Sequence, residues 1–229
     1  RENAALCNFE VAEDTEMSTL IDRLHKVLKA HDGFMVSQIE RNNIERIHGR
    51  AKFISDNEIE VTKVRGEPEQ YQGKNFVIAS GSIPCKPDNI PVDHENIFDS
   101  DSVLSMLYLP KSLTVLGGGV IASEYASIFQ ALGVKVTMVD RYPLPLGFMD
   151  ADLTEKFIHA FQEMGGTWLG EKKVSKVEWD GLSQVVTTCE DGTIVKSSKL
   201  LCAAGREANV KDLDIATAGL VLNDHGNIL

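Results

Sequence analysis

Apolar residues near the start of the chain recur at helical spacing. They lie three, four or seven positions apart between residues 17 and 43, with an interruption near Asp32-Gly33. Such spacing places apolar side chains on one face of a helix with 3.6 residues per turn. The pattern predicts one long or kinked amphipathic helix. The residues that form its apolar face are Leu20, Leu24, Val27, Leu28, Met35 and Ile39.

The next part of the chain alternates short apolar runs with turn residues. Residues 44–47, 51–54, 58–64 and 76–79 have the composition of short strands, and Ser55-Asp56-Asn57 is typical of a turn. Pro84, Pro87 and Pro91 follow, and a proline-rich stretch excludes a regular helix or a central strand. We therefore expect a boundary region that ends near residue 110.

From residue 111 onward, strand and helix patterns alternate. Strands are expected at 113–116 and 134–139, and helices at 120–132, stopped by Gly133, and at 151–164. The second helix has Asp150 as its expected N-cap and Gly165-Gly166 as its stop. A β-α-β-α order is typical of a parallel sheet with right-handed crossovers. The apolar face of this helix is expected to contain Leu153, Phe157, Phe161 and Met164.

The chain then changes to strands joined by tight turns. Residues 174–179, 184–189 and 193–196 are strand-like and are separated by two Asp-Gly pairs, which favour hairpin turns. Residues 200–203 form a last apolar run. The predicted fold class is α/β, with a parallel sheet joined to an antiparallel meander.

Composition and charge narrow the classes of partner. With 43% hydrophobic and 25% charged residues among 229, the chain has an ordinary globular composition. Its net charge of -11 argues against nucleic acid or an anionic membrane as a partner. No apolar stretch approaches the roughly 18 residues of a membrane helix, and the N-terminus does not resemble a secretory signal. We expect a cytoplasmic protein.

The cysteines do not form a recognisable pattern. Cys7, Cys85, Cys189 and Cys202 are widely separated, without a C-x-x-C pair or a histidine cluster. Neither a metal site nor a local redox disulfide is predicted from this spacing. We expect buried thiols.

A glycine-rich turn supplies the clearest candidate chemistry. It follows an apolar strand and opens a helix, the context in which such glycines bind a dinucleotide. Gly117 permits the tight turn, Gly119 lets the backbone approach a pyrophosphate, and the small Ala122 lets the helix pack closely on the strand. The pyrophosphate is expected at the positive end of the helix. The complete predicted turn is Gly117, Gly118, Gly119, Val120, Ile121 and Ala122.

Asp140 and Arg141 bear on which nicotinamide nucleotide is bound. Asp140 ends the second strand at the separation expected for an acid that bonds the adenine ribose, which favours NAD. Arg141 can pair with a 2'-phosphate, which favours NADP. The sequence therefore leaves NAD and NADP both open, and a solvated surface role for Arg141 is the alternative.

Three segments together resemble one family. The glycine turn up to Glu124 resembles the NAD(P) motif of two-dinucleotide-domain flavoproteins, the glutathione reductase and lipoamide dehydrogenase family. Residues 76–84 resemble its "IATGS-x-P" segment, and residues 200–209 its "AxGRxPN" segment. All three occur in the family's order. There are two departures: Ala122 stands where lipoamide dehydrogenases usually show Gly, and Gly147 where NADP-specific glutathione reductases show a second Arg.

The resemblance implies an FAD-binding domain interrupted by an NAD(P)-binding domain. On this mapping, residues 1–110 are part of the FAD-binding domain with a linker, and 111–229 form the Rossmann-like NAD(P)-binding domain. The first FAD glycine loop and the dimerisation domain lie outside the sequence, so we expect a fragment of a homodimer that is inactive alone. The implied FAD-binding residues are Arg50, Ala51, Ser80 and Gly81, and the residues implied near the nicotinamide end are Glu124 and Gly205.

Several activities remain open within this family. Residues 99–105, 124–129 and the Asp140-Arg141 pair most resemble members that exchange hydride between NADPH and NAD through FAD. The alternatives are a dihydrolipoamide dehydrogenase, a mercuric reductase or another disulfide reductase, whose cysteine pair would precede Arg1. A nucleotide-binding regulatory module is the non-enzymatic alternative. Hydride exchange requires no general acid or base, so no catalytic residue is predicted.

Overall fold

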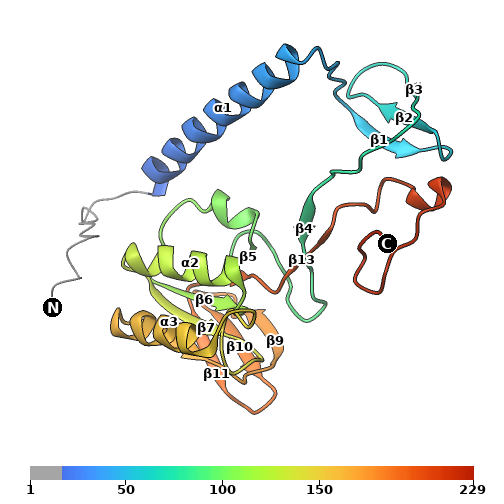
Figure 1. The fold of residues 1–229 in the computed structure, drawn as a ribbon. Helices are drawn as coiled ribbons and strands as arrows, with labels where there is room; N and C mark the ends of the chain where they lie inside the picture. Colours follow the sequence, from blue (N-terminus) through green and yellow to red (C-terminus); the bar gives the residue numbers. More distant parts are fainter. Residues whose placement is uncertain (1–16) are drawn as a thin grey trace. The chain divides into compact units, whose positions relative to one another are not determined.

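The computed structural model describes residues 17–229 (Figure 1). The chain divides into two compact units. Of the described residues, the large unit contains 17–25 and 86–205, and the small unit contains Lys26–Cys85 and Arg206–Leu229. The units thus alternate along the sequence, with divisions after residues 25, 85 and 205. Which nucleotide each part binds stays a prediction.

A five-stranded sheet forms the centre of the large unit. Its order is β5 (Ile97–Asp99), β12 (Lys199–Cys202), β6 (Ser112–Leu116), β7 (Lys135–Val139) and β8 (Thr167–Leu169), and every neighbouring pair is parallel. The predicted parallel sheet is confirmed. The edge strands β5 and β8 were not predicted, because three residues are too few to show a period of two.

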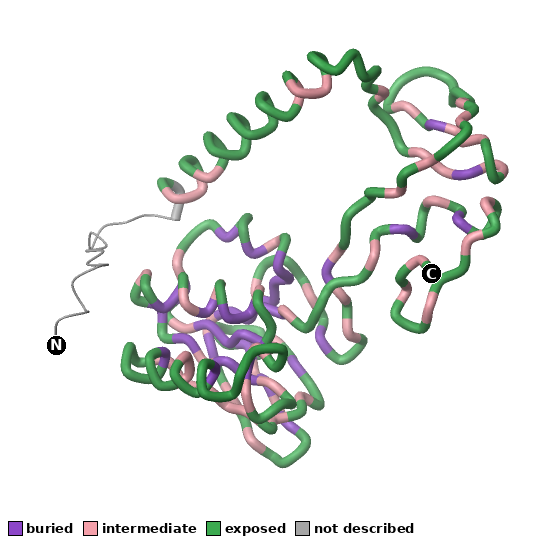
Figure 2. Tube along the Cα trace, viewed as in Figure 1, coloured by how far each residue is buried: buried purple, intermediate pink, exposed green. Residues whose placement is uncertain are grey.

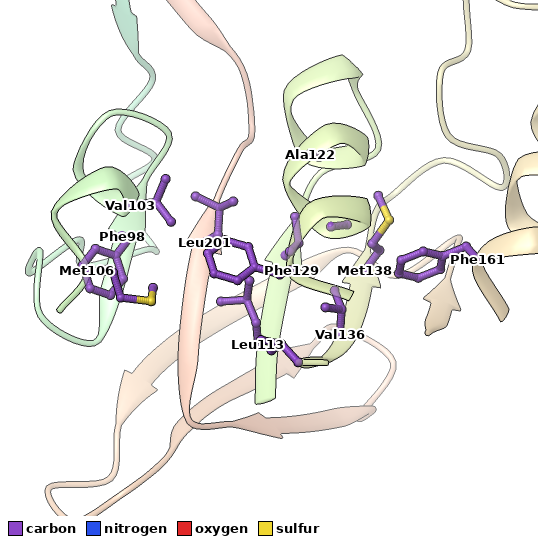
Figure 3. Packing of buried hydrophobic residues seen from close by; sticks show 13 residues of the cluster. Phe98, Val103, Met106, Leu113, Ala122, Phe129, Val136, Met138, Phe161 and Leu201 are labelled. Carbon is purple, nitrogen blue, oxygen red and sulfur yellow. The ribbon is translucent and has the colours of Figure 1, made fainter. Parts of the chain in front are cut away.

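Two helices cover one face of this sheet. They are α2 (Val120–Ala131) and α3 (Ala151–Glu163), close to the predicted ranges. Alternate residues of the central strands point toward them and build the first core cluster with Phe129 and Phe161 (Figure 3). The buried sheet residues of this cluster are Phe98, Leu113, Val115, Val136, Met138 and Leu201.

The predicted apolar face of α3 is partly wrong. Phe161 is 3% exposed, but Leu153 and Met164 are 47% and 59% exposed. Thr154 is buried instead, and its hydroxyl donates to the carbonyl of Ala151 at 2.9 Å, which satisfies the polar group. Asp150 does occupy the N-cap position, although its side chain makes no capping hydrogen bond.

The opposite face of the sheet packs against the antiparallel meander. β9 (Val174–Trp179), β10 (Val185–Cys189) and β11 (Ile194–Ser197) form a sheet of order β11-β10-β9, as predicted. Leu116, Val139 and Leu200 join Val177 and Val185 in the second core cluster. Figure 2 shows the buried positions of this unit gathered along its central strands. A short 3-10 helix, Ser102–Ser105, follows β5.

The small unit contains two antiparallel sheets. β1 (Arg50–Phe53), β2 (Glu58–Thr62) and β3 (Glu69–Gln72) form one, and β4 (Ser82–Pro84) pairs with β13 (Arg206–Ala208) in the other. A 3-10 helix covers Ile215–Ala218. β4 and β13 are more than 120 residues apart in sequence. β4 lies in the "IATGS-x-P"-like segment and β13 in the "AxGRxPN"-like segment, so the fold pairs two of the three motifs.

Predictions for the first 80 residues were mixed. The long helix is confirmed as α1 (Met17–Arg41), uninterrupted at Asp32-Gly33. Residues 44–47 and 76–79 are not strands. Residues 76–79 alternate between half-buried and exposed as a strand does, but no strand among residues 17–229 pairs with them.

The cysteines of the described chain are buried or half-buried. Cys189 and Cys202 are buried as expected, Cys85 is half-buried, and Cys7 lies outside the described residues. Within residues 17–229, no helix is long and apolar enough to cross a membrane.

Candidate functional site

A cleft of about 450 Å³ opens at the carboxyl ends of β6, β7 and β12 in the large unit. This edge is where α/β sheets bind their ligands, because loops from neighbouring strands diverge there. The cleft brings together the three glycines of the predicted turn, residues 117–119, with Asp140, Arg141 and Gly205. The remaining lining residues are Pro87, Asn89, Ile90, Leu116, Val139, Tyr142, Lys172, Lys173, Val174, Ala203 and Ala204.

Gly117 holds the turn tightly between two strands. Its φ is +114°, a conformation that favours glycine, and its N-H donates to the carbonyl of Val139 at 2.9 Å. A Cβ at this position would lie 2.5 Å from the carbonyl oxygen of Ala203. No other residue fits at position 117 without moving the backbone of Ala203, which follows β12.

Gly118 and Gly119 face different surroundings. A Cβ on Gly118 would lie 3.0 Å from the Trp168 ring and 3.2 Å from Asp140 Oδ2, whereas a Cβ on Gly119 would meet no atom within 4 Å. Gly119 is the N-cap of α2, with φ of -78°. The open backbone at Gly119 and the first N-H groups of α2 therefore give an anion a place to bind at the positive helix end.

Asp140 and Arg141 extend from the end of β7 into the same cleft. The Asp140 carboxylate accepts a hydrogen bond from the N-H of Tyr142 at 2.7 Å, which fixes its rotamer. The Arg141 guanidinium lies over the Tyr142 ring, 4.9 Å from its centroid, and both side chains are exposed. The cleft thus presents an acid and a cation at adjacent positions.

Lys172 and Lys173 also line the cleft, and sequence reasoning missed them. Lys172 forms an ion pair with Asp191, and Lys173 Nζ lies 2.7 Å from Glu190 Oε1. The bond to Asp191 raises the pKa of Lys172, and the bond from Lys172 lowers the pKa of Asp191 to about 2. Two adjacent lysines are usually a solvated surface pair, so only the three-dimensional position singles them out.

Other predicted residues lie away from this cleft. Val120 and Glu124 line a separate hollow on α2 with Phe148, Met149 and Phe157. Ala122 is fully buried, and a Cβ on Gly117 would be 3.7 Å from its methyl group, so its small size permits close packing. Ile121 is half-buried and lines neither surface.

The residues expected to touch FAD lie in the small unit. Ala51 and Ser80 line an apolar hollow of about 150 Å³, together with Phe53, Phe76 and Ile78. Arg50 is exposed and lies 3.3 Å from Asp212 in an ion pair.

Contacts from β13 and the residues after it hold the segment around Gly81. Gly81 has φ of +76°, and its carbonyl accepts a hydrogen bond from the N-H of Asn209 at 3.0 Å. Arg206 donates from Nε to the hydroxyl of Ser82 at 2.8 Å, and also to the Ser82 carbonyl. The two motif-bearing segments are therefore joined by side chains as well as by β4 and β13.

Comparison with known proteins assigns the family. Residues 6–229 match the family described as "pyridine nucleotide-disulphide oxidoreductase". The chain belongs to this family, as the three motifs predicted.

Individual relatives fall within the same class. The chain is 34% identical over 205 residues to a soluble pyridine nucleotide transhydrogenase of Colwellia psychrerythraea, covering 90% of this chain and 43% of the relative. A protein of the same name from Aliivibrio fischeri is 30% identical over 226 residues, covering 99% and 48%. The chain spans less than half the length of these relatives.

A solved structure shares the fold. The HOCl-induced flavoprotein disulfide reductase RclA of Escherichia coli superposes with a TM-score of 0.84 at 25% identity, covering 94% of this chain and 48% of that protein. The α/β fold class is thus supported by sequence and by structure.

Proposed function

We propose that this chain is the nicotinamide-nucleotide-binding part of an FAD-dependent oxidoreductase that exchanges hydride between NADPH and NAD. One observation carries the proposal: the cleft places Gly119, Asp140 and Arg141 around one space at the carboxyl edge of the parallel sheet. The names of the relatives that are 30–34% identical support this activity over others in the family.

The residues of the cleft fit a nicotinamide dinucleotide. The space at Gly119, which a side chain would fill, would admit a pyrophosphate against the N-terminus of α2. Asp140 would accept hydrogen bonds from the adenine ribose, and Arg141 would pair with the 2'-phosphate of NADP. Because both side chains line the same cleft, the site suits an enzyme that must use both nucleotides in turn.

The chain contributes only part of an FAD site under this proposal. Ala51 and Ser80 line the hollow of the small unit, while the glycine loop that binds the flavin pyrophosphate in this family lies outside the sequence. FAD, when bound, supplies the hydride acceptor and donor. The residues of this chain would bind and orient the nicotinamide nucleotide, and none is assigned a proton transfer. By resemblance, the full-length protein would be a cytoplasmic homodimer.

Disulfide reduction is the second candidate. The structural likeness to a flavoprotein disulfide reductase favours it. Such an enzyme needs a cysteine pair, and among residues 1–229 the cysteines are widely separated. A C-x-x-x-x-C pair in the part of the full-length protein that precedes Arg1 would favour the reductase, and a lone cysteine there would favour hydride exchange.

The proposal is tested with the full-length protein and with this chain. The full-length protein should show a flavin absorbance band and should transfer hydride from NADPH to an NAD analogue whose reduction is measured at a separate wavelength. This chain alone should bind NAD and NADP by calorimetry, yet carry no stoichiometric flavin band. A full-length protein that lacks flavin but binds nucleotide would support a regulatory module instead.

A further inference from the structure

The loop after β8 is fastened to the loop after β7. The N-H of Glu171 donates to the carbonyl of Tyr142 at 3.1 Å, and the N-H of Lys172 donates to the carbonyl of Asp140 at 2.8 Å. These bonds bring Lys172 beside the Asp140-Arg141 pair, although the two segments are 30 residues apart in sequence. Lys172 consequently lines the same cleft as Asp140 and Arg141.

A sharp bend produces this approach. Gly170 lies so close to the loop after β7 that a Cβ would be 2.6 Å from the carbonyl oxygen of Pro143. Glu171 adopts a left-handed conformation, with φ of +57°, which is uncommon for a residue other than glycine, asparagine or aspartate. A costly backbone conformation persists where the surrounding contacts impose it, and such places are often functional.

The charges of the cleft exceed what the predicted residues supply. Among the described residues that line it, Arg141, Lys172 and Lys173 are cations and Asp140 is the only carboxylate. Lys173 points its charge toward Glu190 with a side chain that is 67% exposed, whereas the Lys172 side chain is 29% exposed. Lys172 is therefore the more enclosed of the two lysines.

We propose that Lys172 is a second specificity-determining residue for the 2'-phosphate of NADP, acting beside Arg141, and that Asp191 positions its ammonium group. The inference rests on the proposed nucleotide-binding function of the cleft. An ammonium group has three N-H donors, so Lys172 can bind Asp191 and still donate to a phosphate. The bond to Asp191 raises the pKa of Lys172, as expected for an ammonium group held against a carboxylate.

Lys172 also accounts for a departure from the resembling sequences. NADP-specific relatives show a second Arg a few residues beyond the first, and this chain has Gly147 there. A second cation from the neighbouring loop would supply the missing charge from a different strand of the sheet.

The test compares two probes that differ only in the 2'-phosphate, adenosine 2',5'-bisphosphate and adenosine 5'-monophosphate. Calorimetric titration of the whole chain should show that Lys172→Gln lowers the affinity for the bisphosphate about tenfold. The affinity for the monophosphate should fall less than twofold. Lys172→Arg, which keeps the charge, should retain most of the preference. Lys176→Gln is the matched control, because Lys176 pairs with Glu178 on β9 and does not line the cleft.

A second measurement keeps the proposal testable if Lys172→Gln folds poorly. The ³¹P shift of the bound 2'-phosphate, followed against pH in the Arg141→Ala chain, which keeps Lys172 and lacks the Arg141 charge, should still show a phosphate pKa below its ordinary value of about 6. An unshifted phosphate, or equal losses for both probes in Lys172→Gln, would overturn the role of Lys172. A wild-type chain that binds neither probe would instead refute the proposed nucleotide cleft itself.

Discussion

The cleft of the large unit and the hollow of the small unit are built in different ways. The cleft is assembled from the ends of adjacent parallel strands. Backbone hydrogen bonds join Gly117 to Val139 and Lys172 to Asp140. The hollow around Ala51 and Ser80 combines a strand of an antiparallel sheet with an unpaired extended segment, residues 76–79. A parallel sheet thus provides a nearly complete candidate site within this chain, while the small unit provides only part of one.

This difference has an energetic side. The strands beneath the cleft are among the most buried parts of the structure, with Val115 and Leu200 at 0% exposure, whereas Val77 beside the hollow is 93% exposed. Burying a Val or Leu side chain contributes about 1.5–3 kcal/mol. We expect the cleft to keep its shape without a ligand. We expect the hollow to require residues other than those of this chain to cover it.

The largest expected effect comes from the glycine turn. Gly117→Ala should destabilise the chain by about 3 kcal/mol, because a positive φ is combined with a clash against the carbonyl of Ala203. Gly119→Ala should fold normally, since an added Cβ there meets open space, but should bind NAD and NADP at least tenfold more weakly. Thermal unfolding and calorimetry of both variants separate the two roles. A normal melting temperature for Gly117→Ala would contradict this description of the turn.

Arg141 should have an intermediate effect that depends on the nucleotide. Arg141→Ala removes a charge-assisted contact worth about 1.5–3 kcal/mol, so NADP affinity should fall about 10- to 100-fold while NAD affinity changes less than twofold. Calorimetry at matched salt measures both. Arg141→Lys should lose less, because it keeps the charge without the planar fork. Equal losses for NAD and NADP would make Arg141 a bystander stacked on Tyr142.

Asp191 should have the smallest effect, and that effect should disappear at acid pH. Its pKa is lowered to about 2 by the bond from Lys172, while an unfolded aspartate titrates near about 3.9. The ion pair therefore contributes stability above pH 4 and loses it as the pH falls toward 2. Without nucleotide, the melting temperature of Asp191→Asn should lie slightly below that of wild type at pH 7, and the difference should shrink as the pH falls from about 4 toward 2. A gap that persists unchanged at pH 2.5 would contradict the assigned pKa.

The comparison also explains what the sequence could predict. The parallel strands and the helices of the large unit have long, periodic patterns, and the glycine turn is recognisable because its residues are consecutive. Lys172 was missed because its position depends on a bend at Gly170 and on hydrogen bonds to another loop. The strand expected at 76–79 was wrong for a similar reason, since a strand requires a partner that the local sequence does not specify.

Asp140 is the residue on which the account of the cleft depends most. Its carboxylate is fixed by the Tyr142 N-H and lies beside Gly118, where an adenine ribose would be bound next to the glycine turn. Asp140→Asn retains a carbonyl oxygen for the Tyr142 N-H while removing the charge. The substitution therefore isolates the electrostatic role of the side chain.

The most direct measurement is a calorimetric titration of wild-type and Asp140→Asn chains with NAD and NADP at the same ionic strength. We predict that the substitution weakens NAD binding about tenfold, or roughly 1.4 kcal/mol, and leaves NADP binding unchanged or stronger, because the lost charge no longer repels the 2'-phosphate. An unchanged ratio of NAD to NADP affinity would contradict the claim that Asp140 binds the adenine ribose in this cleft.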